Sequence, residues 1–188
     1  YCKSRGRKKV TVLHKANIMK MSDGLFIGCT RDIWQKEYAE IEYEEVIIDA
    51  GCMRLVQEPT NFDVLLCENL YGDVMSDLCA GFVGGLGVTP GANFGNDHAV
   101  FEAVHGSAPD IAGKGLANPL AITMSGVMMF NHLFETTQDN GIKSAASRVR
   151  DAYNATLSEG CLTADLGGNL GTEEFADAVI SRLSGVHA

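Results

Sequence analysis

Two aspartates, Asp73 and Asp77, stand four residues apart in the segment NLYGDVMSD, which follows a predicted buried strand. Four residues are about one helical turn, so a helix beginning there places both carboxylates on one face at its N-terminal end. Like charges on neighbouring turns repel each other, and a divalent cation bound between them removes that cost. Compensation of the helix dipole explains the same pair without a ligand. The spacing therefore indicates either a cation site or a stabilised helix end.

A third aspartate, Asp49, ends the predicted strand 45–49 (EVIID). In an open parallel sheet, the carboxyl ends of the strands line the ligand crevice. Three carboxylates at such positions supply the hard oxygen ligands that Mg2+ and Mn2+ prefer. Asp49 therefore favours the metal interpretation of Asp73 and Asp77.

A lysine, Lys15, directly follows the predicted first strand 10–14, at the same end of the sheet as the aspartates. A lysine at this place can donate to an anionic substrate or help to move a proton at a hydroxyl group. Taken alone, Lys15 is explained more simply as a solvated residue at a strand end. His14 is predicted to pack rather than to act in catalysis, whereas Asn17 either donates its amide to a ligand or caps the next helix.

Two glycine-rich segments, 84–95 and 105–119, contain small residues that let backbone N–H groups approach a cofactor closely. Neither carries the GxGxxG pattern of a Rossmann fold after a strand. In the second segment, Asp110 could accept hydrogen bonds from both ribose hydroxyls of NAD, and it would repel the additional phosphate of NADP. A long surface connection explains this second segment equally well. The first segment is expected to be either a functional loop or a lobe boundary.

The elements that must position these residues alternate between apolar strands and helices. Buried parallel strands need helical crossovers, so this alternation predicts an α/β fold with a parallel sheet. The final helix is expected to be capped by Thr172, with Glu173 and Glu174 in its first turn and Arg182 near its end. The expected strands are 10–14, 45–49, 62–69 and 99–104, and the expected helices are 18–40, 50–57, 73–83, 119–134, 145–157 and the one after Thr172.

Composition narrows the functional class of this chain of 188 residues, which is long enough to bury a sizeable core. A formal net charge of -9 disfavours binding to nucleic acid or to anionic lipid. No apolar run reaches the length of about 18 residues that a membrane span needs. The six cysteines form no CxxC pair, which favours reduced, buried thiols of an intracellular protein over a zinc site. The first ten residues contain neither an initiator methionine nor a signal peptide, so we expect the chain to begin inside a longer protein.

Four segments, in the same order along nearly the whole chain, resemble the β-decarboxylating dehydrogenases, most closely the mitochondrial NAD-dependent isocitrate dehydrogenases. The segments are HKANIMKMSDGLF, NLYGDVMSDLCAGFVGGLGVTPGAN, FEAVHGSAPDIAGKGLANP and DLGGNLGTEEFADAV. The resemblance implies the C-terminal half of a two-lobed isocitrate/isopropylmalate dehydrogenase-like fold with parallel-rich sheets, incomplete at its N-terminal side. Residues 1–83 would belong to a central, dimer-forming lobe, and residues 84–188 to the C-terminal part of the larger, cofactor-binding lobe.

The resemblance further implies metal-dependent oxidative decarboxylation of isocitrate to 2-oxoglutarate, with hydride transfer to NAD, as part of the tricarboxylic acid cycle in the mitochondrial matrix. Lys15 matches the lysine that assists deprotonation of the substrate hydroxyl, and it would act with Asp49 and Asp73. Asp49, Asp73 and Asp77 match the aspartates that hold Mg2+ or Mn2+. Because Lys15 and Asp49 project into the partner's site in this family, the expected assembly is at least a dimer, as a homo- or hetero-oligomer or within a larger mitochondrial complex.

The same resemblance assigns the cofactor positions. Relatives that use NADP hold its additional phosphate with a tyrosine and an arginine, where this chain has Ala164 and Gly168, so NAD is the expected cofactor. Asp110 would lie on the ribose, and His105 and Asn118 near the adenine. The residues that match cofactor positions are Asn17, Glu102, His105, Gly106, Asp110 and Asn118.

Two alternatives to an NAD-dependent isocitrate dehydrogenase subunit stay open. The first is 3-isopropylmalate dehydrogenase, which shares the cofactor loop and the aspartates. The second is a noncatalytic regulatory or assembly subunit that retains the fold.

Overall fold

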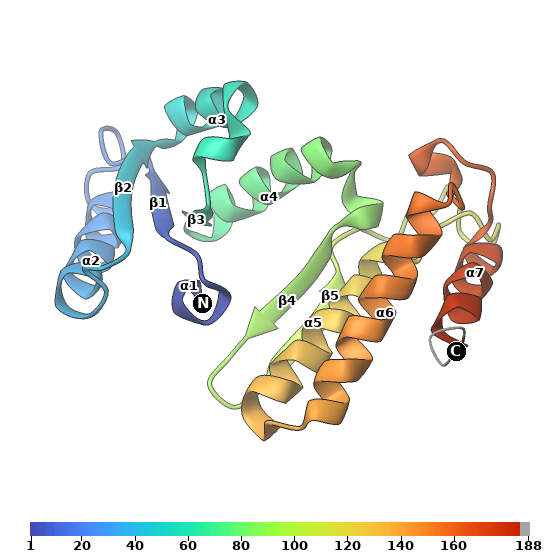
Figure 1. Ribbon diagram of the computed structural model, residues 1–188. Helices are drawn as coiled ribbons and strands as arrows, with labels where there is room; N and C mark the ends of the chain where they lie inside the picture. The colour runs from blue at the N-terminus through green and yellow to red at the C-terminus, as the bar shows by residue number, and fades with distance from the viewer. Residues whose placement is uncertain (185–188) are drawn as a thin grey trace. The chain divides into compact units, whose positions relative to one another are not determined.

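The computed structural model describes residues 1–184, which divide into two compact units. Unit 1 is Tyr1–Leu78 and unit 2 is Cys79–Ala188. The division falls inside helix α4 (Asn69–Val83), whereas the sequence predicts the change of lobe after residue 83. The two units together give the chain its α/β class (Figure 1).

Unit 1 contains a three-stranded parallel sheet in the order β2-β1-β3. The central strand is the most apolar, because Val12 and Leu13 are completely buried between neighbouring strands and the covering helices. Gly51, in the helix that follows β2, approaches Leu13 so closely that a Cβ atom would lie 2.8 Å from a Leu13 methyl group. The elements are α1 (Cys2–Arg5), β1 (Lys9–His14), α2 (Ser22–Glu37), β2 (Glu42–Ile47), α3 (Ile48–Gln57), a 3-10 turn (Pro59–Asn61), β3 (Val64–Leu66) and the start of α4.

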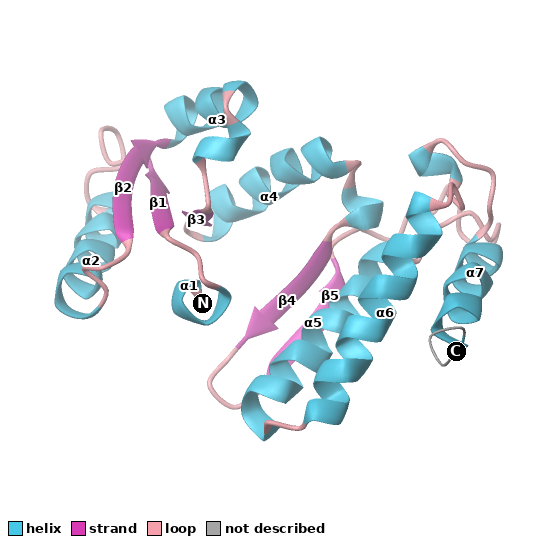
Figure 2. Cartoon of the chain, in the orientation of Figure 1, coloured by secondary structure: helices cyan, strands magenta, loops and turns pink. Residues whose placement is uncertain are grey.

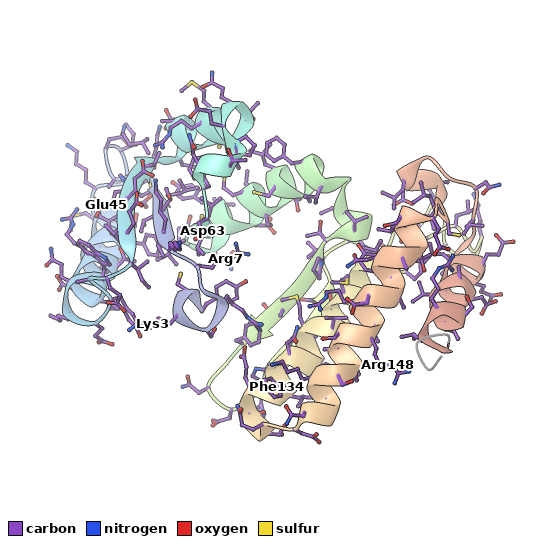
Figure 3. The ribbon with its side chains drawn as sticks, viewed as in Figure 1. Lys3, Arg7, Glu45, Asp63, Phe134 and Arg148 are labelled. Carbon is purple, nitrogen blue, oxygen red and sulfur yellow. The ribbon has the colours of Figure 1, made fainter. Side chains whose placement is uncertain are left out.

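Side chains outside the sheet fix the edge at which its strands begin. Asp63, just before β3, accepts hydrogen bonds from Arg7 Nη1 at 3.1 Å and from the backbone N–H of Lys8 at 2.7 Å. Arg7 and Asp63 lie next to each other in the side-chain view (Figure 3). The backbone N–H of Lys8 and the Arg7 guanidinium hold the pKa of the Asp63 carboxyl below its ordinary value. This contact joins the beginnings of β1 and β3, which are distant in the sequence.

Unit 2 combines a two-stranded antiparallel hairpin with three helices. The hairpin runs alongside α5, which packs against α6 (Figure 2). Ser125 of α5 links helix and hairpin, because its hydroxyl donates to the carbonyl of Glu102 at 2.6 Å and accepts from the N–H of Gly91 at 3.2 Å. The elements are a 3-10 turn (Leu86–Val88), β4 (Pro90–Phe94), β5 (Ala99–Ala103), α5 (Leu120–Thr137), α6 (Asn140–Ser158), a second 3-10 turn (Ala164–Leu166) and α7 (Thr172–Ser184).

The core of unit 2 lies where its three helices meet. Its buried members are Leu120 of α5, Ala152 of α6, and Phe175 and Val179 of α7. Burial of these apolar side chains, at about 25 cal/mol per Å2, is the main force that holds α7 against the other helices. The first turn of α7 carries Glu173 and Glu174 and its last turn carries Arg182, so the predicted dipole compensation is confirmed.

Several predicted element boundaries are wrong. Strand β2 ends at Ile47, so Asp49 lies in the first turn of α3 rather than at a strand end. Helix α4 begins at Asn69, so Asp73 and Asp77 lie beyond its first turn. Helix α3 follows β2 without a connecting loop. Helix α4 begins earlier than predicted because Asn69, Leu70 and Tyr71 can adopt helical backbone as readily as Asp73 can.

Four further expectations need correction. Residues 90–94 of the glycine-rich segment 84–95 form strand β4, because pairing with β5 overrides their low strand propensity. Thr172 is the first residue of α7 rather than its cap, and helix α5 starts one residue after Pro119. The six cysteines are free, but they are half-buried or exposed rather than buried.

Among the described residues, no helix is both long enough and apolar enough to span a bilayer.

Candidate active site and cofactor loop

Lys15 and Asp49 meet at the carboxyl edge of the parallel sheet. Strands β1 and β2 pair in register up to His14 and Ile47, so the residues that follow both strands leave the sheet side by side. Lys15 Nζ donates a hydrogen bond to Asp49 Oδ1, which makes the two side chains an ion pair. The structure therefore brings together two of the residues that the sequence singles out.

The ion pair is accessible to a ligand. The side chain of Lys15 is 28% exposed and that of Asp49 is 69% exposed. The hydrogen bond from Lys15 lowers the pKa of the Asp49 carboxyl. An ion pair this exposed to solvent contributes little to stability, so its arrangement fits a site better than a structural bridge.

The residues on either side of Lys15 form a tight turn. His14 Nδ1 accepts the backbone N–H of Ala16 at 3.1 Å, and His14 is half-buried, in agreement with the predicted packing role. Asn17 is exposed in the same turn. Helix α2 begins at Ser22 with Met21 as its N-cap, so Asn17 does not cap it. Of the two roles predicted for Asn17, the contact with a ligand stays a prediction.

The two aspartates of α4 are exposed one turn apart on the surface of unit 1. Two large apolar side chains of the same helix, Leu70 and Val74, are also exposed, at 62% and 57%. This stretch of α4 thus combines carboxylates with apolar surface, a composition that suits contact with another chain.

The three aspartates form no metal-holding cluster within the part of one chain that the structure describes. Within residues 1–184, no three His, Cys, Asp or Glu side chains are arranged to hold a metal ion. Asp49 pairs with Lys15, whereas Asp73 and Asp77 share one face of α4. The donor chemistry of these three carboxylates fits Mg2+ or Mn2+. A site shared between two chains, with Asp49 supplied by one and Asp73 and Asp77 by the other, stays a prediction.

The expected cofactor loop lies in unit 2, between β5 and α5. Every residue from 104 to 117 is exposed, including His105, Gly106 and Asp110. His105 Nδ1 lies 3.0 Å from the carbonyl oxygen of Gly106, within the loop itself. On β5, the carboxylate of Glu102 accepts a hydrogen bond from Asn93 at 2.8 Å. The loop therefore presents a solvent-facing surface, and its contact with NAD stays a prediction.

The loop is held at its C-terminal end. Asn118 is 7% exposed, and its Oδ1 accepts the N–H of Leu120 at 3.0 Å while its Nδ2 donates to Asp165 at 3.0 Å. Thr172 adds two bonds, from its N–H to the carbonyl of Gly115 at 2.8 Å and from its hydroxyl to that of Ala117 at 2.5 Å. Because the Asn118 side chain already holds α5 and Asp165, its backbone is the better candidate to contact a cofactor.

Position 168 is closed to larger residues. A Cβ atom on Gly168 would overlap the carbonyl oxygen of Leu162, far inside the contact distance of the two atoms. Ala164, in contrast, is exposed at the start of the second 3-10 turn of unit 2. The backbone itself therefore excludes an arginine at one of the two positions that the resemblance links to the NADP phosphate.

Sequence reasoning missed two residues that organise these regions, Asp23 in unit 1 and Asp165 in unit 2. Asp23 is buried beside Lys15, and Asp165 accepts hydrogen bonds from Asn118 and Thr163. The only signal in the sequence was their place within the segments SDGLF and TADLGG. Polar residues in such segments usually serve as caps or turns, so their long-range bonds could not be read from spacing.

Comparisons with known proteins agree with this organisation. The model of the isocitrate/isopropylmalate dehydrogenase family matches residues 1–179. The mitochondrial NAD isocitrate dehydrogenase catalytic subunit 5 of Arabidopsis thaliana is 54% identical over 185 residues, which are 97% of this chain and 47% of the relative. A regulatory subunit of the mitochondrial NAD isocitrate dehydrogenase of Dictyostelium discoideum is 50% identical over 186 residues, 98% of this chain and 50% of the relative. The 3-isopropylmalate dehydrogenase of Archaeoglobus fulgidus is 51% identical over 181 residues, 96% of this chain and 53% of the relative.

A solved structure from the same family has a similar fold. The crystal structure of isocitrate dehydrogenase from Methylococcus capsulatus matches with a TM-score of 0.90 and 48% identity, over 97% of this chain and 52% of that chain. The chain spans about half the length of the curated relatives it matches. Catalytic, regulatory and isopropylmalate-named relatives are about equally identical to it, so overall identity does not separate these three roles.

Proposed function

Because this chain belongs to the isocitrate/isopropylmalate dehydrogenase family, we propose that the whole protein oxidises and decarboxylates isocitrate to 2-oxoglutarate, with NAD as the hydride acceptor. The observation that carries the proposal is the accessible Lys15–Asp49 pair at the carboxyl edge of the parallel sheet. Substrates of α/β folds bind at this edge. The pair supplies a proton-transferring amine beside a carboxylate, as the oxidation of a hydroxy acid requires.

Lys15 acts on the substrate hydroxyl. Lys15 assists removal of the proton that leaves when the hydroxyl is oxidised to a ketone, and the neighbouring Asp49 holds the Lys15 side chain in place through its hydrogen bond. Asp49, Asp73 and Asp77 would hold a divalent metal between two subunits, and the bound metal would supply Lewis-acid polarisation of the substrate oxygen. The resemblance to the family, in which Lys15 and Asp49 project into the partner's site, supports this arrangement. The active assembly is therefore at least a dimer.

The exposed loop of unit 2 binds the cofactor. Asp110 would hold the ribose hydroxyls of a bound NAD, and His105, Gly106 and the Asn118 backbone would hold its adenine end. Glu102 and Asn17 complete the set of cofactor residues. The exclusion of a side chain at Gly168 supports NAD over NADP. Relatives from Arabidopsis and Drosophila are named mitochondrial, and the proposal places this protein in the mitochondrial matrix, within the tricarboxylic acid cycle.

Two other functions have specific support. An archaeal 3-isopropylmalate dehydrogenase is 51% identical to the chain, so the bulkier 2-hydroxy acid is the main alternative substrate. A Dictyostelium regulatory subunit is 50% identical, which supports a noncatalytic role beside a catalytic partner. The presence of Lys15, Asp49, Asp73 and Asp77 in one chain favours the catalytic role, because a purely regulatory subunit has no need of them.

Steady-state turnover of the full-length protein tests the proposal. With Mn2+ and NAD present, we expect turnover of isocitrate well above that of 3-isopropylmalate, and a decrease of about 100-fold or more in kcat for Lys15→Met. The matched control is Lys20→Met, an exposed lysine of the same turn region, which should keep full activity. Turnover of 3-isopropylmalate alone would move the assignment to the alternative substrate. Activity that appears only with a separate catalytic subunit, and that survives Lys15→Met, would assign the regulatory role.

A further inference from the structure

A buried carboxyl group stands behind Lys15. Asp23, in the first turn of α2, is 6% exposed. Its Oδ2 accepts the backbone N–H of Lys15 at 2.7 Å, and its Oδ1 accepts the hydroxyl of Ser22 at 3.0 Å. Aspartate is rarely buried unless its oxygens are paired, so these bonds explain why the side chain is tolerated here.

The bond to Lys15 lies just beyond the end of the sheet. The ladder between β1 and β2 ends at His14 and Ile47, so Lys15 is one residue past the last paired position of β1. A buried N–H without an acceptor costs about 1–3 kcal/mol, and Asp23 supplies that acceptor from eight residues farther along the chain. The carboxylate thereby fixes the backbone from which the Lys15 side chain extends.

The same carboxyl group reaches helix α4. The phenol of Tyr71, in the first turn of α4, is hydrogen-bonded to Asp23. Partial burial raises the pKa of the Tyr71 phenol most, and the charge of Asp23 and its hydrogen bond raise it further. Asp23 therefore contacts the end of β1, the start of α2 and the start of α4. These are the elements that carry Lys15 on one side and Asp73 with Asp77 on the other.

We infer that Asp23 is a positioning residue, which sets the place of Lys15 and of the first turn of α4 in unit 1. The inference rests on the proposed function, because it assigns Asp23 a role only through residues proposed to act on the substrate and the metal. Proton transfer depends steeply on geometry, and a displacement of about 1 Å lowers rates by about 100-fold. A simple dipole-compensating aspartate would not need the bond to a residue outside its own helix.

The test compares substitutions of Asp23 in the full-length protein. Asp23→Ala removes every acceptor and is expected to lower kcat for isocitrate by about 100-fold, with KM changed less than about threefold. Asp23→Asn keeps a carbonyl oxygen for the Lys15 N–H and is expected to recover at least about a tenth of the wild-type kcat. Asp32→Ala, at an exposed position of the same helix, is the matched control and should leave kcat unchanged.

Hydrogen exchange of the peptide that contains Lys15 gives a readout that does not depend on turnover. Asp23→Ala should speed exchange of the Lys15 amide by about 10-fold or more, whereas Asp23→Asn should largely preserve its protection. Unchanged exchange, or unchanged kcat in an active Asp23→Ala protein, would overturn the positioning role. If wild-type protein shows no turnover of isocitrate, the proposed function fails, and unchanged exchange in Asp23→Ala would then still reject the anchoring of Lys15.

Discussion

The two units place their proposed functional residues in opposite surroundings. In unit 1, Lys15 is held through both its ends, because its backbone donates to the buried Asp23 and its amine donates to Asp49. In unit 2, the residues of the proposed cofactor loop from 104 to 117 are all exposed. That loop is anchored where it enters α5, through Asn118, Asp165 and Thr172.

This difference reflects two physical requirements. A group that moves a proton must lie within a few tenths of an ångström of the reacting atom, so its backbone and side chain both need fixed partners. A loop that binds a large cofactor must leave its polar groups free for the ligand, and anchors at its ends are sufficient. Substitutions in unit 1 should therefore affect kcat, whereas substitutions in the loop should affect the affinity for NAD.

The largest effect is expected at the carboxylates of α4. Asp73→Asn removes a charged oxygen ligand, and we expect turnover to fall by about 1,000-fold or more and Mn2+ affinity to decrease, with the fold preserved because Asp73 is exposed. Metal titration of activity and circular dichroism measure the two quantities. Ser76→Ala on the same exposed stretch is the control. Wild-type metal dependence in Asp73→Asn would remove this residue from the metal site.

The next largest effect concerns the backbone of unit 2. Gly168→Ala places a methyl group against the carbonyl of Leu162. We expect the free energy of unfolding to decrease by about 3 kcal/mol, because the segment must shift to relieve the overlap. Thermal unfolding measures this loss. Gly126→Ala, where a Cβ meets no atom within 4 Å outside its own helix turn, should be neutral or slightly stabilising. A Gly168→Ala protein as stable as wild type would contradict the close approach.

The contrast between affinity and turnover is tested most directly at Asp110. Replacing it by lysine removes the proposed ribose acceptor, and we expect KM for NAD to rise by about 10- to 100-fold while kcat changes less than about threefold. Lys114→Ala, in the same exposed loop, is the control. Initial-rate kinetics at varied NAD concentration separate the two parameters. A fall in kcat at unchanged KM would show that the loop acts on chemistry rather than on binding.

The anchor of the loop should have a moderate effect. Asp165→Ala leaves the Asn118 amide and the Thr163 hydroxyl without their acceptor, and we expect stability to decrease by about 1 kcal/mol and KM for NAD to rise by about fivefold. Asp151→Ala, exposed on α6, serves for comparison. Urea unfolding and NAD kinetics provide the measurements. If neither quantity moves, the loop is positioned by Thr172 and the backbone alone.

The smallest expected effect is a difference between the two units in how their stability changes at acidic pH. Every described carboxyl with a lowered pKa, namely Glu40, Glu44, Glu45, Asp49 and Asp63, belongs to unit 1. A carboxyl whose pKa is lower in the folded protein stabilises it above the unfolded value, about 4, and that contribution disappears as the pH falls through the folded value. Unit 1 should therefore lose stability between about pH 5 and 3.

Trp34 reports this transition, because it is the only tryptophan and it stacks on Tyr43 at 4.8 Å. Glu44 is bonded to Lys9 and Arg54, and the bond from Lys9 is the main cause of its lowered pKa. Glu44→Gln should shift the acid midpoint of Trp34 fluorescence by less than about one pH unit. Glu173→Gln, on α7 of unit 2, should leave that midpoint unchanged. An equal response to both substitutions would contradict the assignment of the acid-sensitive contacts to unit 1.

Much of the architecture was predictable from local patterns, and the errors have physical reasons. The strand at residues 10–14 was predictable because a run of apolar residues is typical of a buried parallel strand, and β1 confirms it. The end of the strand before Asp49 was predicted two residues too late, because nothing in EVIIDAGC marks where extended backbone becomes helical. Strand β4 was missed because glycine and proline favour loops, and only its pairing partner β5 makes it a strand.

The sequence by itself determined the α/β class, the family and the identity of the residues proposed to do chemistry, because these depend on residue type, order and short-range spacing. The tertiary structure alone decided that Lys15 pairs with Asp49, that Asp23 lies buried behind Lys15 and that no side chain fits at position 168. These facts depend on strand register and on the packing of segments far apart along the chain. Local patterns do not encode such contacts, because each arises only when the free energy of the whole unit is minimised.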